Sequence, residues 1–394
     1  MPSAQMANRP LGFRNVVRLG LVSLFTDVST EMILGVLPYF IVTELGATAA
    51  VLGLIEGASE AVNYVFRVIA GFVTDKIGRR TPLVMLGYGF SSIAKPLFAF
   101  ASAPWQAFVV RVLDRAGKGT RTSPRDALIS DSISRTEAGK GFGLHRSLDQ
   151  VGAVLGPVLA FIVIPLIGVR GVFWASFIPA AIALLILIFF VKDIRGGTNE
   201  GTAFQNLRSV MNRSFVLLLI VLAIFNVGAF NFSFILLNAE LLGIQDSKIL
   251  ALVYGVLNVA TVILGLPSGI LADRVGKTHV LLLSYGMFLV TSAAGLLLTG
   301  STLYAFVIAF LFGSYLAISE TVQRAMIPDF TRPRLKGSAY AVYYMVIGAC
   351  SFVANSIFGY LWTISGSSVA FQYSLVTSFL GIIALAVFTT ARGR

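Results

Sequence analysis

The chain has little charge and almost no cysteine or histidine. Only 12% of its 394 residues are charged, and it contains one cysteine and two histidines. A soluble globular domain carries about 25% charged residues, so an ordinary soluble fold is excluded. Cys350 stands alone in an apolar run, which excludes a disulfide framework and a cysteine-based metal site. His145 and His279 are too few for a histidine-rich site, and we expect neither a resident metal nor another cofactor.

Apolar runs of about 20 residues recur from end to end and predict membrane-spanning helices. The sequence therefore predicts an all-α membrane protein that lies in a lipid bilayer. We expect twelve spans, at 17–42, 49–74, 81–101, 104–131, 139–167, 171–191, 212–240, 247–272, 278–299, 302–328, 336–364 and 368–390.

Lysine and arginine outnumber acidic residues by 30 to 18, a balance that would favour nucleic-acid binding in a soluble protein. With the N-terminus placed inside, 19 of these cations fall on inside segments, and only Arg170 and Lys248 fall outside. This is the positive-inside pattern, so no nucleic acid is needed to explain the charge. It predicts a multi-pass protein of the cytoplasmic membrane with both termini in the cytoplasm. The N-terminus has no signal-peptide cleavage pattern and is expected to be a cytoplasmic tail.

Two motifs repeat along the chain. Gly71-Phe-Val-Thr-Asp75-Lys76-Ile-Gly78-Arg79-Arg80 follows the second span, and Gly269-Ile-Leu-Ala-Asp273-Arg274-Val-Gly276-Lys277 follows the eighth, 198 positions later. Near the same offset, Arg125-Asp-Ala-Leu-Ile-Ser-Asp131 is echoed by Arg324-Ala-Met-Ile-Pro-Asp329. The repeat predicts two pseudo-symmetric six-helix halves with a site between them. We place the halves at 1–191 and 212–394, joined by a polar, glycine-containing cytoplasmic linker at 192–211.

These loop motifs, together with Arg111 in the fourth span and Gly152-Ala-Val-Leu-Gly156-Pro157 in the fifth, resemble the major facilitator superfamily. The resemblance extends from Arg18 to about Thr390. It implies alternating access, with spans one, four, seven and ten lining a central cavity. The Gly156-Pro157 pair is similar to the Gly-Pro motif of proton-driven exporters in that family.

The same resemblance implies that charges of the loop motifs contact each other at the cytoplasmic surface and bias the gate. The cytoplasmic end of the fourth span and the polar part of the fifth are expected to belong to this gate. The gating candidates are Asp75, Arg79, Arg80, Arg125, Asp126, Asp149, Gly156, Pro157, Asp273 and Arg274.

Acidic residues inside spans one and two are candidates for proton coupling. Asp27 and Glu31 are four residues apart on one helix face, and two close carboxylates disfavour double ionisation, so one would hold a proton. The alternative is that they only neutralise the basic fourth span. In the second span, Glu60 is a further candidate, Glu56 is expected near the outer interface, and Arg67 is expected to be structural.

The fourth span carries cations at helical spacing, more than its two aspartates can neutralise. An excess of buried positive charge would attract an anionic group, and arginine suits bidentate contacts with carboxylate or phosphate. The second half is polar but mostly uncharged, and most of its phenylalanines (Phe225, Phe230, Phe232 and Phe234) are expected to face lipid. The cavity candidates are Arg111, Asp114, Arg115, Lys118, Asn226, Asn231, Glu320, Arg324 and Tyr344.

The sequence thus predicts a monomeric, proton-coupled secondary transporter that exports a small polar or amphipathic solute, with an anionic or zwitterionic one as the leading case. The alternative is a divalent metal or cationic drug exporter that uses the carboxylates of spans one and two. A membrane sensor would need an appended soluble domain, and no loop is long enough. An enzyme would need a nucleophile beside His145 and Asp149, and none is placed there, so we expect no enzymatic activity.

Overall fold

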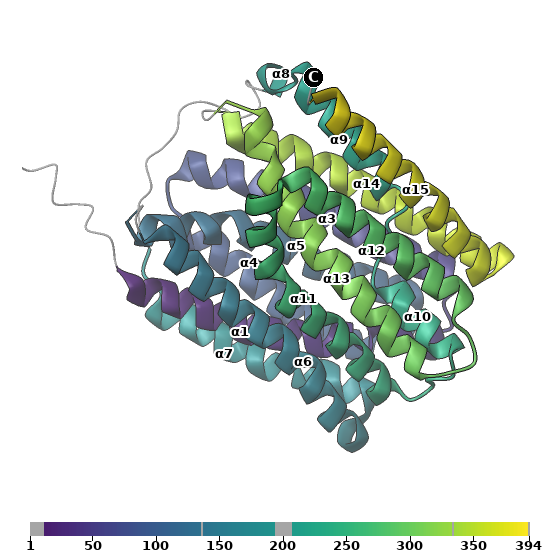
Figure 1. Cartoon of the computed structure of the whole chain (residues 1–394). Coiled ribbons are helices and arrows are strands. Elements are labelled where there is room, and N and C mark those ends of the chain that lie inside the picture. Colours follow the sequence, from purple (N-terminus) through teal and green to yellow (C-terminus); the bar gives the residue numbers. More distant parts are fainter. Residues whose placement is uncertain (1–11, 135–136, 194–206, 333–334, 393–394) are drawn as a thin grey trace, which may run out of the picture.

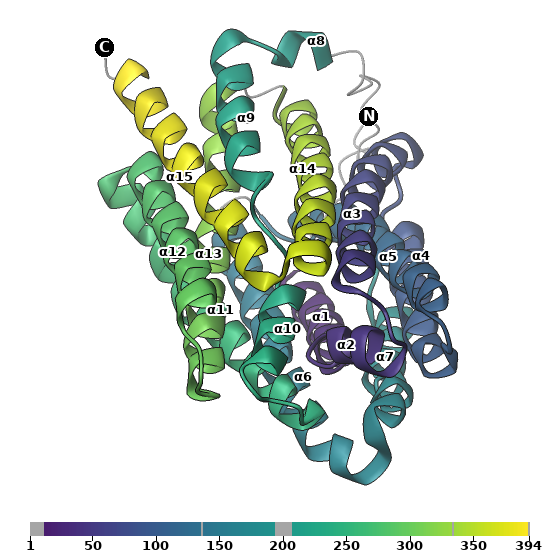
Figure 2. The ribbon, with the colours of Figure 1, turned by 90° about the vertical axis from the view of Figure 1, so that its right-hand side faces the viewer.

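The computed structural model describes residues 12–134, 137–193, 207–332 and 335–392, and these residues form helices joined by short turns (Figure 1). The helices form two bundles that lie side by side (Figure 2). We call the end of the molecule at which α1 begins and α15 ends the terminal end, and the opposite end the far end.

The first bundle contains six spans. Span one bends at Gly35 and continues through a short π-helical turn. Gly168, at φ 69°, breaks α6 and separates spans five and six. The elements are α1 (Phe13–Leu34), α2 (Leu37–Tyr39), a π-helical turn (Phe40–Glu44), α3 (Ala49–Ile77), α4 (Thr81–Ala94), a 3-10 helix (Lys95–Phe100), α5 (Pro104–Ser132), α6 (Ala138–Ala175) and α7 (Phe177–Phe190).

The second bundle repeats this plan. Its first span, the seventh of the chain, is interrupted between α9 and α10. The elements are α8 (Leu207–Val210), α9 (Arg213–Asn226), α10 (Ser233–Leu241), α11 (Ser247–Val275), α12 (Lys277–Leu297), α13 (Leu303–Met326), a 3-10 helix (Ile327–Phe330), α14 (Lys336–Ser365) and α15 (Ser367–Arg392).

The expected all-α membrane fold is confirmed, and the described helices are consistent with twelve spans in two six-helix halves. Eight helical segments of the described chain are long and apolar enough to cross a membrane, and one of these, 139–190, holds two spans. The remaining spans are α3, α5 and the interrupted α9–α10. Because α3 and α5 carry the buried charges, they do not meet a simple hydropathy criterion.

The two halves meet along α3 against α14 and along α6 against α11. The first contact depends on glycine. A Cβ atom on Gly53 would lie 2.2 Å from the carbonyl oxygen of Asn355, and one on Gly359 would lie 2.4 Å from that of Ala49. Only glycine allows the helix backbones to approach this closely.

Hydrogen bonds between the halves lie between the middle of the bundle and its far end. Thr43 donates to Glu240 over 2.9 Å, and the Ala50 amide donates to Thr363 over 2.8 Å. The side chains of Tyr254 and Asn258 also cross the interface, as described below. The described ion pairs near the terminal end each stay within one half. The molecule is therefore held closed at the far end.

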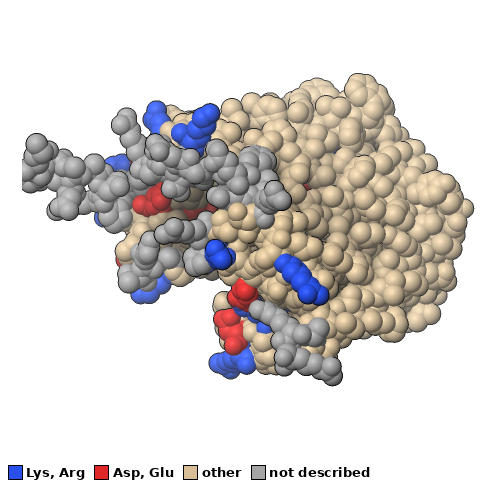
Figure 3. All heavy atoms as spheres, turned by 90° about the horizontal axis from the view of Figure 1, so that it is seen from above, with Lys and Arg blue, Asp and Glu red and all other residues tan. Residues whose placement is uncertain are grey.

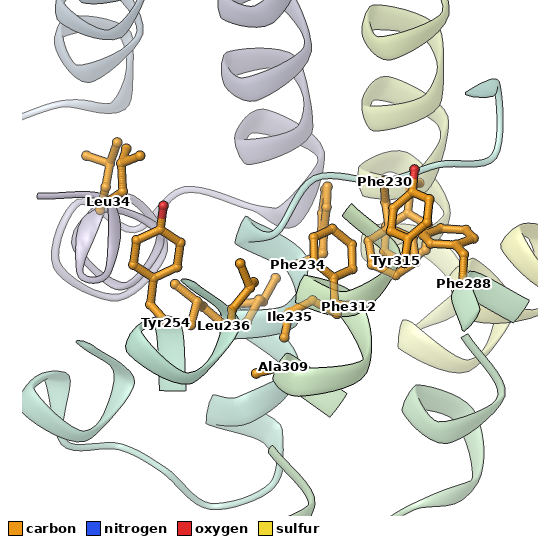
Figure 4. Close-up of a cluster of buried hydrophobic side chains, with 14 of the residues drawn as sticks. Leu34, Phe230, Phe234, Ile235, Leu236, Tyr254, Phe288, Ala309, Phe312 and Tyr315 are labelled. Carbon is orange, nitrogen blue, oxygen red and sulfur yellow. The ribbon is translucent and has the colours of Figure 1, made fainter. Parts of the chain in front are cut away.

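The second half has an aromatic core (Figure 4). Phe230 packs against Phe288 and Phe312, with ring centroids 5.0 and 5.7 Å apart, and Phe225 stacks on Tyr285 at 3.5 Å. The expectation that the phenylalanines near the seventh span mostly face lipid is wrong. Phe225, Phe230 and Phe234 are buried, and Phe232 packs on Tyr254, because the break after α9 turns this segment into the bundle.

Candidate functional site

Arg111, the cation of α5 nearest the far end, is neutralised by two acidic side chains. Arg111 is 1% exposed; its Nη2 lies 2.8 Å from Oε2 of Glu56, and its Nη1 lies 3.7 Å from Oδ2 of Asp114. Asp114 also accepts a hydrogen bond from Ser91 Oγ over 2.5 Å. The interfacial position expected for Glu56 is wrong, since it is 2% exposed and neutralises Arg111. This network ties α3, α4 and α5 together.

A second buried cation, Lys95, was not among the candidates from sequence. It is 1% exposed, and its Nζ donates to Thr30 Oγ1 on α1 over 3.2 Å. Asp114 is the acidic residue whose charge interacts with Lys95 most strongly. The signal in the sequence was a lone lysine inside an apolar span, which is costly in a membrane unless it has polar partners.

Nearer the middle of α5, the charges are less completely paired. Glu60 is half-buried, accepts a hydrogen bond from Asn63 over 2.9 Å, and interacts electrostatically with Arg115, Lys118 and Arg67. Among the described residues, Arg115 and Lys118 make no ion pair within 4.0 Å, and Nε of Arg115 is buried without a hydrogen-bond partner. These two cations are therefore less completely paired than Arg111.

The sequence suggested that Asp27 pairs with Glu31. In the structure, Asp27 lies beside Asp149 of α6. The charge of Asp27 interacts more strongly with Asp149 than with Glu31, and Lys118 is the cation that acts most strongly on Asp27. Two carboxyl groups that lie close together disfavour double ionisation. Asp149 also accepts from Ser23 Oγ over 2.5 Å and from Arg146 over 3.2 Å. Two acidic side chains from α1 and α6 thus lie together near the middle of the bundle.

Glu31 instead connects the two halves. Its Oε2 accepts a hydrogen bond from the Tyr254 hydroxyl over 2.5 Å and from Nδ2 of Asn258 over 3.2 Å. Nδ2 of Asn258 also lies 2.9 Å from the carbonyl oxygen of Ala153. The contacts of Tyr254 and Asn258 with Glu31 could not be predicted from the sequence, because neutral polar residues on an apolar helix are common.

Gly156 and Pro157 lie where α1, α6 and α11 cross. A Cβ atom on Gly156 would lie 2.6 Å from that of Glu31, and one on Gly255 would lie 3.4 Å from that of Pro157. The Gly-Pro pair therefore sets the close approach of α6 to both neighbours and lies directly beside the Glu31 link.

The candidates in the second half have mixed surroundings. Asn226 donates to the carbonyl of Leu222 over 2.7 Å, and Asn231 Oδ1 accepts from the Ser233 amide over 2.9 Å, so both support the break in the seventh span. Arg324 and Glu320 pair at 2.8 Å on α13 with 37% and 44% of their side chains exposed. Charged groups within a span need water, so we infer that they face a hydrated space.

Charges gather at the terminal end, and most of the remaining face is free of them (Figure 3). Two ion pairs there have similar positions in the repeat, Arg80 with Asp131 at 3.3 Å and Lys277 with Asp329 at 2.7 Å; the aspartates correspond, and Lys277 corresponds to Arg79, the neighbour of Arg80. Each joins the loop motif of its half to the end of spans four or ten. The repeated sequence thus produces a repeated contact.

The other gating candidates are less uniform. Arg125 pairs with Asp126 at 2.9 Å, and Arg79 pairs with Asp193 at 3.0 Å. Asp273 and Arg274 are exposed and form no ion pair with a described residue. The side chain of Asp75 lies outside the described part of the structure.

Asp193 follows α7 outside the spans. Partial burial acts to raise the pKa of Asp193, but hydrogen bonds from the Thr81 amide and from Arg79 outweigh burial and hold that pKa below its ordinary value.

Asp27 and Glu31, the carboxylates considered for a divalent cation, thus have other partners. In the ranges that the structure describes, no group of three histidine, cysteine or acidic side chains is arranged to hold a metal ion.

The sequence pattern of the Major Facilitator Superfamily matches residues 19–264 and 216–394. An uncharacterized MFS-type transporter of Methanocaldococcus jannaschii is 32% identical over 380 residues, which cover 94% of each chain. The multidrug resistance protein MdtG of Proteus mirabilis is 26% identical over 280 residues, 66% of this chain and 68% of that protein.

Solved transporters share the fold. A mutant of the nucleoside transporter NupG superposes with a TM-score of 0.79 at 11% identity, over 95% of this chain and 99% of that one. A bacterial homolog of the human lysosomal transporter Spinster, in an inward-facing and occupied conformation, superposes with a TM-score of 0.75 at 15% identity, over 98% and 97% of the two chains.

Proposed function

Because the chain belongs to the major facilitator superfamily and is a secondary transporter, we propose that it couples proton movement to the export of a small polar or amphipathic solute that carries an anionic group. The observation that carries the proposal is the close approach of α1 and α6, where Ser23 donates to Asp149 and Gly152 lies against Asp27, so that two aspartates lie together near Lys118. It combines a proton site with an incompletely neutralised cation at the middle of the membrane.

Proton and solute are linked through charge. Gain or loss of the shared proton changes the charge next to Lys118 by one unit, and Lys118 and Arg115 are the cations best placed for the anionic group of the solute. In a zwitterionic solute, a cationic group would compete with the proton for Asp27. That competition would make transport an exchange of proton for solute.

The relatives and the charge distribution support export as the direction of transport. Among the relatives are multidrug resistance proteins, and Gly156-Pro157 has the position in span five that the exporter motif would occupy. Lysine and arginine at the terminal end favour a cytoplasmic location for that end. The structure is held closed at the far end, so the site would load from the cytoplasmic side.

The coupling is tested in proteoliposomes with labelled anionic, zwitterionic and cationic solutes, with and without a pH gradient. We expect Asp27→Asn and Asp149→Asn to abolish accumulation driven by the gradient, while counterflow of the solute continues. Glu137→Gln, a change at an exposed carboxylate outside the spans, is the matched control. Gradient-driven accumulation that survives both aspartate changes would show that the pair is not the proton site.

The solute site is tested with Arg115→Gln and Lys118→Gln. Each should weaken binding of the anionic solute at least tenfold, because each removes a cation that has no close carboxylate partner. Arg213→Gln, at the exposed start of α9, is the control. Unchanged affinity in both variants would remove α5 from the solute site.

A further inference from the structure

Tyrosines and arginines from both halves form a cluster toward the terminal end of α3. Tyr64 of α3 and Tyr344 of α14 stack with ring centroids 5.5 Å apart and an interplanar angle of 20°. Arg67, one turn after Tyr64, places its guanidinium carbon 5.4 Å from the Tyr64 ring and 4.9 Å from the Tyr344 ring. A planar cation thus lies against aromatic rings of both halves.

A second guanidinium approaches the same rings from α13. Arg324 forms an ion pair with Glu320 at 2.8 Å, and its charge also interacts with Tyr344 and Tyr64. Tyr64 in turn lies within the electrostatic influence of Glu60, Arg67, Glu320 and Arg324. Charged groups from α3 and α13 therefore surround one aromatic pair.

The two arginines differ in how they are neutralised. Arg324 has Glu320 at 2.8 Å, whereas Arg67 has no ion-pair partner within 4.0 Å among the described residues. Nε of Arg67 is also buried without a hydrogen-bond partner. Tyr64 and Tyr344 are only half-buried, so their surfaces are accessible. The cluster thus has an unneutralised guanidinium with a free N–H donor beside accessible aromatic surface.

We propose that Tyr64, Arg67 and Tyr344, with Arg324 opposite, form a subsite for a planar aromatic carboxylate. The carboxylate would take the unpaired donors of Arg67, since the guanidinium fork matches two carboxylate oxygens. The aromatic ring of the ligand would stack on the tyrosines, which prefer offset or edge contacts with another ring. A ligand held in this way touches both halves. The inference rests on the proposed function: Arg67 adds a third cation to Arg115 and Lys118, since all three interact with Glu60, and the tyrosines specify the class of solute.

The test uses the full-length protein in nanodiscs, without a pH gradient, and measures binding by calorimetry. Benzoate should bind at least tenfold more tightly than cyclohexanecarboxylate, which keeps the charge but lacks the aromatic face. Benzylamine, which keeps the ring and reverses the charge, should not compete with benzoate. If wild-type protein does not bind benzoate, or binds the two acids equally, the proposal is overturned.

Variants separate a binding role from a packing role. Arg67→Gln and Tyr344→Leu should each weaken benzoate binding at least tenfold, whereas Tyr344→Phe, which keeps the ring, should bind normally. Tyr360→Leu is the control, since Tyr360 is on the same helix with 57% of its surface exposed. If Arg67→Gln lowers the melting temperature of the ligand-free protein but leaves benzoate affinity unchanged, the cluster is only a clamp between the halves, and the proposal fails.

Failure of the proton mechanism can be recognised separately. Benzoate binding is measured without a pH gradient, whereas the proton mechanism is tested by gradient-driven accumulation in Asp27→Asn and Asp149→Asn. Loss of benzoate binding in Arg67→Gln together with intact proton-driven transport of another solute would support the subsite and leave the coupling mechanism untouched.

Discussion

The hydrogen bond from Tyr254 to Glu31 predicts a measurable shift in how the far end opens. Tyr254→Phe removes one hydroxyl and keeps the ring. The bond is 2.5 Å long, joins α11 to α1, and ends on a carboxylate. A hydrogen bond to a charged group contributes about 1.5–3 kcal/mol. If the bond exists only when the far end is closed, its loss shifts the closing equilibrium about 10- to 100-fold, at about 1.4 kcal/mol per factor of ten.

The shift can be measured as a change in distance between the halves. Cys350 is the only cysteine, so Cys350→Ala provides a background for spin labels at Ser102→Cys and Gln245→Cys, two exposed far-end positions on opposite halves. In that background, Tyr254→Phe should increase the long-distance population in pulsed dipolar spectra. The matched control is Tyr373→Phe, which removes a hydroxyl bonded to a carbonyl within the second half.

A double-mutant cycle with Glu31→Gln tests whether the two groups act as one unit. Glu31→Gln keeps an acceptor oxygen but removes the charge, and charge-assisted bonds are about twice as strong as neutral ones. Its effect should therefore overlap with that of Tyr254→Phe, and the double variant should shift less than the sum. Strictly additive shifts, or a Tyr254→Phe distribution equal to that of the Tyr373→Phe control, would refute this account of far-end closure.

Three further predictions concern stability and helix packing. Glu56→Gln leaves the guanidinium of Arg111 without its nearest carboxylate and should lower the free energy of unfolding by up to about 3–5 kcal/mol. Denaturant titration in detergent measures this loss, and a double variant with Arg111→Gln should recover part of it. Equal stability of the Glu56 variant and the wild type would contradict the prediction. Gly53→Leu should prevent the close α3–α14 contact and abolish transport. Gly89→Ala should not, because a Cβ atom at Gly89 has no other atom within 4 Å. Normal transport by the Gly53 variant would show that the contact is dispensable. Because the pKa of Asp193 is lowered in the folded state, its stabilisation is present above the ordinary aspartate value of about pH 4 and lost as the pH falls below it. Asp193→Asn should therefore destabilise the protein at pH 7 and have less effect near pH 3, and a pH-independent difference would contradict this.

Much of the architecture could be predicted from the sequence, because membrane burial leaves a strong one-dimensional signal. Runs of about 20 apolar residues are needed to cross the hydrocarbon core, so the spans could be located from composition alone. Repeated motifs indicated two halves, and the repeat is visible in the structure as the Arg80–Asp131 and Lys277–Asp329 ion pairs. The break in the seventh span after Asn226 was not predicted, since its residues remain apolar across it.

Partnerships inside the bundle could not be predicted in the same way. Helical spacing shows that Asp27 and Glu31 share a face of α1, but not which helix meets each of them. In the structure they have different neighbours, Asp149 for Asp27 and Tyr254 for Glu31. Glu56 was misplaced for the same reason, since its partner lies 55 positions away on α5.

The sequence by itself determined the class of protein, the number of spans and the presence of buried charge, because the low dielectric of the membrane makes each of these visible in composition. Only the tertiary structure decided which charges neutralise one another and which stay available. Arg111 is neutralised by Glu56, whereas Arg115 and Lys118 have no ion-pair partner among the described residues, although all three lie on one stripe of one helix. The physical reason is that ion pairing depends on distances of a few ångströms between helices, and these distances are set by packing at glycines such as Gly53 and Gly156.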